Sequence, residues 1–131
     1  LSREHELLQT LMNNMPDPVY FKDSENRFLM VNKAMAANNN AKPDEMIGKT
    51  DFDYLSPKRA QEVFKEDEEV MNTGKFIINK PRKFVREDEV ESWVSVTKIP
   101  RFDEEGSVIG MMGIKKDITY WKKIEASQNN K

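Results

Sequence analysis

The chain has 131 residues, of which 37% are hydrophobic and 34% charged, so it has the size and composition of one globular domain with a highly charged surface. Its 21 basic and 23 acidic residues leave a net charge of −2, which gives no overall field to attract nucleic acid or an anionic membrane. The absence of cysteine excludes disulfides, a thiolate nucleophile and a cysteine metal site, and it is compatible with the cytoplasmic location that we expect. No apolar run is long enough to cross a bilayer, so we expect no direct membrane insertion.

Local sequence signals divide the chain into alternating groups of helices and strands. In chain order they predict a helix over 2–14, strands over 19–22 and 27–31, short helices after Asn32 and from Pro43, a long helix over 56–73, strands over 76–86, 92–100 and 107–116, and a helix from Tyr120. Ser2, Asn32 and Ser56 are the predicted helix N-caps. Gly106 suits the left-handed position of a turn between the last two strands. The pattern predicts an antiparallel sheet with a helical group over one face.

The long helix over 56–73 is amphipathic. Its apolar residues share one face, and they are Ala60, Val63, Phe64, Val70 and Met71. We interpret the acidic run over 66–69 as a solvated face, and a small enzyme that uses Glu66 or Asp67 is a remote alternative.

Seven short motifs in a fixed order resemble the PAS sensor family over roughly residues 4–123. They are Pro18–Asp23, Phe28–Ala34, Ile47–Phe52, Thr73-Gly74, Ile99-Pro100, Asp103–Gly106 and Gly113–Thr119. The resemblance implies an α+β, profilin-like fold: a five-stranded antiparallel sheet in the order 2-1-5-4-3, with helices on one face around a central pocket. We expect residues 1–15 to form an N-terminal flanking helix, 16–119 the sensor domain, and 120–131 the start of a C-terminal linker helix. The lack of an initiator Met leads us to expect a piece of a longer protein.

Catalytic residues and metal ligands are not predicted. His5 is the only histidine and lies on the N-terminal helix, so a nucleophilic dyad lacks a base and zinc or haem lacks a ligand set. The resemblance implies cofactors in some relatives, but cysteine-linked flavins and other cysteine-linked chromophores need a cysteine, and haem needs a histidine from the long helix. A non-covalent flavin, a small metabolite or no ligand remains open.

Alternate strand positions and apolar helix faces predict a set of residues that line the pocket or fill the core. The apolar and aromatic candidates are Tyr20, Phe28, Met30, Met35, Phe64, Met71, Phe84, Val94, Val96 and Met111. Methionine suits both plastic packing and adaptable binding, so these two interpretations stay open.

Three lysines fall within predicted strands, at Lys22, Lys98 and Lys115, and strand alternation places them on one face of neighbouring strands. A buried cation needs an anionic partner. Two interpretations follow: the lysines, together with Arg82, meet a carboxylate-bearing ligand, or they extend to the sheet rim and pair internally with Asp23 or Asp117.

The junction between the last strand and the last helix is the predicted output. Thr119 can cap the helix from Tyr120, and Asp117 places negative charge beside its N-terminus. Trp121 and Ile124 have the spacing of a coiled-coil seam. The resemblance implies that this junction relays a signal to a downstream effector, such as a histidine kinase of a two-component system or a cyclic-dinucleotide enzyme.

The sequence therefore predicts a cytoplasmic, non-catalytic sensor module that binds a small ligand, forms a homodimer and has an effector domain in the same chain. A ligand-free module that only dimerises and relays is the alternative.

Overall fold

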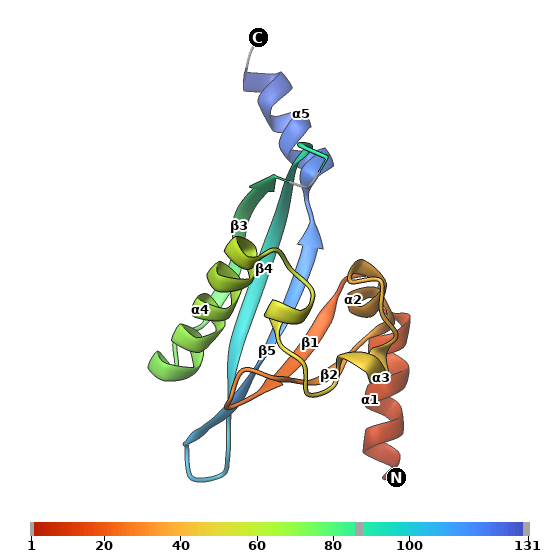
Figure 1. Ribbon diagram of the computed structural model, residues 1–131, viewed down its shortest axis with the longest axis vertical. Helices are drawn as coiled ribbons and strands as arrows, with labels where there is room; N and C mark the ends of the chain where they lie inside the picture. The colour runs from red at the N-terminus through yellow and green to blue at the C-terminus, as the bar shows by residue number, and fades with distance from the viewer. Residues whose placement is uncertain (1, 86–87, 130–131) are drawn as a thin grey trace.

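The computed structural model describes residues 2–85 and 88–129 (Figure 1). The elements in chain order are α1 (Arg3–Asn14), β1 (Val19–Asp23), β2 (Phe28–Val31), α2 (Lys33–Asn38), α3 (Pro43–Met46), the 3-10 helix η1 (Asp51–Asp53), α4 (Pro57–Thr73), β3 (Ile77–Val85), β4 (Glu91–Phe102), β5 (Val108–Asp117) and α5 (Thr119–Asn129). Each predicted helix and strand is present, with ends shifted by one or two residues. Arg86, the predicted end of β3, lies outside the described residues.

The five strands form one antiparallel sheet in the order β2-β1-β5-β4-β3, which confirms the expected topology. β5 is central: it pairs with β1 up to Ile114 and with β4 from Val108 to Asp117. Opposite residues in the ladder share a face, so Tyr20, Gly113 and Lys98 lie in one row across β1, β5 and β4. The predicted strand neighbours and their alternation are therefore correct.

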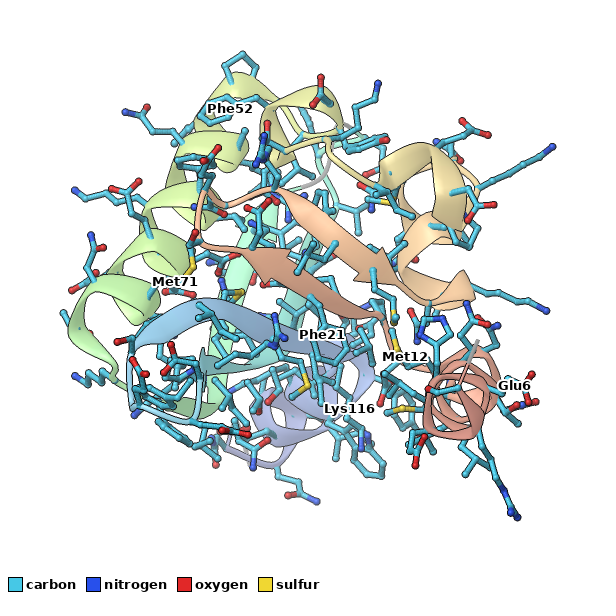
Figure 2. All side chains as sticks on the ribbon, turned by 90° about the horizontal axis from the view of Figure 1, so that it is seen from below. Glu6, Met12, Phe21, Phe52, Met71 and Lys116 are labelled. Carbon is cyan, nitrogen blue, oxygen red and sulfur yellow. The ribbon has the colours of Figure 1, made fainter. Side chains whose placement is uncertain are left out.

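The helices divide between the two sides of the sheet. Helix α4 packs across β4 and β5, while α3 packs on β2 and α2 on β1 (Figure 1). In the view of Figure 2, Phe52 of η1 and Lys116 of β5 lie on opposite sides of the strands, and α1 lies toward the Lys116 side. We call the side that faces α4 the inner face.

Local capping fixes several boundaries as predicted. The Ser2 hydroxyl accepts a hydrogen bond from the His5 amide, and Gly74 ends α4 in the left-handed region at φ 69°. Gly106 has φ 87° in the last hairpin, as its position requires. Ser56 is the N-cap residue of α4, but its side chain forms no capping hydrogen bond.

Asn32 does more than cap α2. Its side-chain oxygen accepts from the amides of Met35 and Val19, and its side-chain nitrogen donates to the carbonyls of Met12 and Asp17. This fully buried amide ties the end of α1, the start of β1 and the start of α2 together. All of its hydrogen-bonding groups are used, which offsets the cost of burial.

The core lies between the inner face and the helices. Its buried members are Tyr20, Phe28, Val31, Met35, Ala36, Met46, Val70, Met71 and Met111. The Tyr20 ring packs edge to face on Phe28, with ring centres 5.9 Å apart. It also lies directly over Gly113, where a Cβ would overlap the tyrosine ring. Gly113 is therefore needed to let Tyr20 lie flat against β5.

Replacing Gly113 with alanine should lower the free energy of unfolding by about 1–3 kcal/mol, because the added methyl group displaces the Tyr20 ring. Urea unfolding measures the loss. In a Tyr20→Leu background the same substitution should cost at least about 1 kcal/mol less, since the overlapping atoms are gone. An equal cost in both backgrounds would contradict this account.

Candidate functional site

Six charged side chains meet between the inner face and the helices. We call them the charge network, and they are Lys22, Asp51, Glu66, Asp67, Arg82 and Lys98. They come from β1, η1, α4, β3 and β4, so the network joins the sheet to the helices that cover it. Its three cations and three carboxylates sum to no net charge.

Lys22 is fully buried and lies at one end of this network. Its ammonium group donates to Asp51 at 2.5 Å, to Asp67 at 2.7 Å and to the side-chain oxygen of Asn26 at 2.8 Å. The group also lies 5.1 Å from the centre of the Phe28 ring. Three hydrogen bonds satisfy all three ammonium protons, which is what a buried lysine requires.

Lys98 forms the other half of the network. Its ammonium group lies 2.7 Å from Asp67 and 2.9 Å from Glu66, and Glu66 also accepts from Arg82 at 2.9 Å. Asp67 thus bridges the two buried lysines with its two oxygens. The Tyr20 hydroxyl donates to the same carboxylate at 3.2 Å.

Burial and the neighbouring charges shift the pKa values of several groups in the network. Burial by itself would raise the pKa of the Asp67 carboxyl, but the charges of Lys98 and Lys22 outweigh it, and the pKa lies below its usual value. Burial would likewise lower the pKa of Lys98, but the Asp67 charge outweighs it, so this pKa is raised. Burial, and then the charge of Asp67, raises the pKa of Tyr20 well above 10. Asp67 and Lys98 are therefore ionised at neutral pH, and Tyr20 is neutral.

The solvated-face interpretation of the acidic run is wrong for its first two residues. Asp67 has no exposed surface and Glu66 is half-buried, whereas Glu68 and Glu69 are exposed. The sequence did indicate that Asp67 is buried, because it lies three or four residues from Phe64, Val70 and Met71, in the middle of the apolar face.

The expected internal partners of the lysines are also wrong. Asp23 pairs with Arg27, and the Asp117 carboxylate accepts from the Thr119 amide. Asp23 directly follows the inward-facing Lys22, so strand alternation turns it to the opposite face, and Asp117 at the end of β5 is exposed to water. Asp51, which sequence reasoning missed, takes the partner role because the capping box of η1 turns that segment over β1.

The structure brings most of the predicted pocket residues together on the inner face. Tyr20, Phe28, Met35, Met71 and Met111 are in the core cluster, and Lys22 and Lys98 are in the charge network. Val96 is buried beside them, while Phe84, Val94 and Lys115 are half-buried toward the end of the sheet that carries α5.

Two predicted pocket residues lie elsewhere. A β-bulge skips Leu29 in the pairing of β1 with β2, so Phe28 and Met30 point to opposite faces. Met30 lines a surface groove of about 570 Å³ between α1 and α3, which His5 also lines. Phe64, in the middle of α4, packs against Phe52 of η1 with ring centres 5.3 Å apart.

Thr119 attaches the start of α5 to Trp93 of β4, whereas the sequence predicts that it caps the helix. The Thr119 hydroxyl accepts from the Trp93 amide at 2.9 Å and donates to the Trp93 carbonyl, so it does not cap the helix. Asp117 does bond to the Thr119 amide, as its predicted place beside the helix start allows. Lys122 adds a cation–π contact at 4.8 Å from the Trp93 ring. Trp121 is 62% exposed.

The chemistry of the site is ionic and hydrophobic. Within residues 2–85 and 88–129, no group of three or more histidine or carboxylate side chains is placed to hold a metal ion. Each helix of the same ranges is too short or too polar to span a lipid bilayer.

The family model of the PAS fold matches residues 12–121, which is most of the chain. The chain is a PAS domain. As such it is a sensory module and not a catalytic one.

Two curated relatives are histidine-kinase or sensor proteins. The PAS domain is 25% identical over 119 residues to the methanogenesis regulatory histidine kinase FilI of Methanothrix harundinacea, covering 91% of this chain and 13% of FilI. It is 23% identical over 123 residues to the aerobic respiration control sensor protein ArcB of Escherichia coli, covering 94% of this chain and 16% of ArcB. The chain thus spans a small part of these multidomain proteins.

Among solved structures, this PAS domain is similar to VqmA bound to DPO, with a TM-score of 0.71 and 25% identity over 86% of this chain and 57% of VqmA. A Vibrio cholerae VqmA dimer gives the same TM-score, with 26% identity over 91% of this chain and 52% of VqmA.

Asp67→Asn should lower the free energy of unfolding by about 3 kcal/mol or more, because two buried lysines lose their shared anion. Chemical unfolding at neutral pH measures it, with Glu68→Gln on the exposed face as a control expected within about 0.5 kcal/mol of wild type. Because folding lowers the pKa of Asp67, the wild-type advantage should be complete above the ordinary value of 3.8 and shrink as the pH falls further. Equal losses in the two variants would refute the role given to Asp67.

Proposed function

We propose that this PAS domain belongs to a multidomain signal-transduction protein, a histidine kinase or a similar regulator, and binds a small ligand on the inner face. It forms a homodimer and passes the signal to an effector domain through α5. The observation that carries the proposal is the course of β5: Lys115 lies on the inner face, and Thr119, four residues later, holds the start of α5 against β4.

Ligand binding is supported by the residues that converge on the inner face. Phe84, Val94 and Lys115 are only half-buried there, so side chains of the chain do not cover them completely. The similarity to VqmA, of which a structure bound to DPO is known, supports a bound ligand.

Relay through α5 is supported by how few contacts hold that helix. None of its residues is buried, and an isolated helix of 11 residues is marginal in water. Its orientation therefore rests on Thr119, Asp117 and Lys122. A change at the end of β4 or β5 would alter the exit direction of α5.

Dimerisation is supported by apolar side chains on both flanking helices. Leu7 and Leu11 of α1 are 60% and 62% exposed, and Trp121 of α5 is exposed to the same extent. Exposed leucines on a helix flanking the sheet are typical of a surface that a second protein covers. The dimeric state of Vibrio cholerae VqmA is consistent with this.

A ligand-free relay module is a second candidate. It is favoured by the core cluster, in which Tyr20, Phe28, Met71 and Met111 fill the centre of the inner face, and by the internal partners of Lys22 and Lys98.

Native mass spectrometry of the purified chain separates the two candidates and tests the dimer. The sensor proposal predicts a mass of two chains plus a retained small molecule that is lost on denaturation. A dimer without added mass, under several growth conditions of the expression host, would favour the ligand-free module. A monomer at micromolar concentration would contradict the dimer.

Thr119→Val should detach the start of α5 from β4, because valine keeps the shape but cannot pair with the Trp93 amide. Hydrogen exchange of the α5 amides should become about tenfold faster, equivalent to about 1.4 kcal/mol, while core amides of β1 and β5 keep their rates. Thr119→Ser retains the hydroxyl and serves as the control. Unchanged exchange in the valine variant would remove the basis for relay at this point.

A further inference from the structure

Two half-buried cations between the inner face and α4 have no ion-pair partner among residues 2–85 and 88–129, and they are Lys115 and Arg59. Lys80 of β3 lies on the same face and is also outside these ion pairs, but its side chain is exposed to water. The Lys115 ammonium group lies 5.6 Å from the centre of the Tyr20 ring, and the Arg59 guanidinium lies 4.0 Å from the centre of the Phe84 ring. Both side chains are half-buried. In contrast, the three cations of the charge network all contact carboxylates.

The surroundings leave the charge of Lys115 uncompensated. Burial, and then the positive charge of Lys98, lowers its pKa from 10.5 to about 8, and Arg59 acts in the same direction. Asp51 and Asp67 attract it, but their oxygens already bond Lys22 and Lys98. Burial also lowers the pKa of Arg59, opposed by Glu62 one turn further along α4.

The remaining neighbours on the sheet are both charged and apolar. Lys80 and Arg82 of β3 and Asp117 of β5 share the inner face with Val96 and Val94. Arg82 already pairs with Glu66, and the Asp117 carboxylate accepts from the Thr119 amide.

Val96 stands opposite Lys115 in the β4–β5 ladder, Val94 is two residues away on β4, and Phe84 stands opposite Ser92 near the end of β3. Val96, Val94 and Phe84 supply apolar side chains beside the two positive charges. Such an arrangement suits a ligand with one acidic group and an apolar body.

We propose that the inner face between Arg59 and Lys115 binds a small apolar carboxylate, whose anionic group pairs with these two cations and whose apolar part lies against Phe84 and Val94. This proposal rests on the ligand-binding function proposed above and names the chemical class of the ligand. It moves the anion site away from Lys22, Lys98 and Arg82, which have carboxylate partners already.

The substitution Lys115→Met is suited to the test because it should not unfold the domain. At neutral pH it removes a charge that is costly to bury, so the variant should unfold at a higher temperature than wild type. The sign follows from the lowered pKa: the penalty is complete below pH 8 and disappears as the pH rises from 8 toward 10.5, where the unfolded chain also loses the proton. The stability gap should shrink over that window. Lys116→Met, on the exposed opposite face, should show neither effect.

Benzoate is the probe, with the neutral isostere benzamide as its control. Benzoate should raise the unfolding temperature of the wild-type chain, and its affinity should fall at least about tenfold in Lys115→Met and in Arg59→Met, as expected for a lost charged hydrogen bond. Lys116→Met should bind as wild type does. Benzamide should have no effect on any of the four proteins.

Proton uptake gives a readout that a purely structural role would not change. A bound carboxylate raises the lowered pKa of Lys115, so binding near pH 8 should take up about half a proton, measured as the difference in calorimetric heat between phosphate and Tris buffers. Lys115→Met should take up none. Absence of benzoate binding to wild type, equal affinity in Lys115→Met, or binding without proton uptake would each overturn the proposal.

The two proposals can fail separately. If native mass spectrometry finds a retained neutral molecule while benzoate does not bind, the sensor function stands and the carboxylate class is wrong. If benzoate binds as described but leaves hydrogen exchange in α5 unchanged, the ligand class stands and relay is wrong.

Discussion

The fold depends on one buried carboxylate, that of Asp67, held between Lys22 of β1 and Lys98 of β4. Each of these ions would be very unfavourable in the interior alone, and only close pairing with full hydrogen bonding offsets the desolvation. Hydrophobic contacts would let α4 slide along the sheet at little cost, because they lack direction. The two short ion pairs of Asp67 are directional and would break if α4 moved, so Asp67 fixes the height and register of α4 over β4 and β5.

The charge network is electrically neutral by itself, so the cations outside it need a separate explanation. Lys22, Lys98 and Arg82 are matched by Asp51, Glu66 and Asp67, so nothing in the network calls for an external anion. Two further half-buried cations, Lys115 and Arg59, nevertheless lie between the inner face and α4, toward the α5 end. A domain selected only for stability would place apolar residues at such positions. The surplus charge is therefore better explained by something that the chain binds there.

The sequence was sufficient for the elements and their pairing because their signals are local or repetitive. Asn32, Gly74 and Gly106 mark boundaries by capping and turn chemistry, and strand alternation correctly placed Lys22, Lys98 and Lys115 on one face. The network was missed because its pairs are distant in the chain: Lys22 and Asp67 are 45 residues apart. Composition also gave a wrong prediction, because a run of acidic residues predicts solvent exposure. The helical spacing of Asp67, in contrast, places it on the apolar face of α4. The bulge at Leu29, which turns Met30 outward, leaves no clear mark in a four-residue strand.

The position of β5 limits how a signal could travel. Up to Ile114 the strand is bonded on both sides, to β1 and β4, so a sliding motion there would break two ladders. Beyond the bond from the Lys115 amide to Pro18, the strand pairs only with β4, and the Trp93 backbone continues that pairing to Ile118 and Thr119. The segment from Lys116 to Thr119 can therefore change twist against β4 without disturbing the core. An anion that draws the Lys115 side chain toward Arg59 would act on the residue where this freedom begins, which makes a twist of the β4–β5 end the least costly route from the inner face to α5.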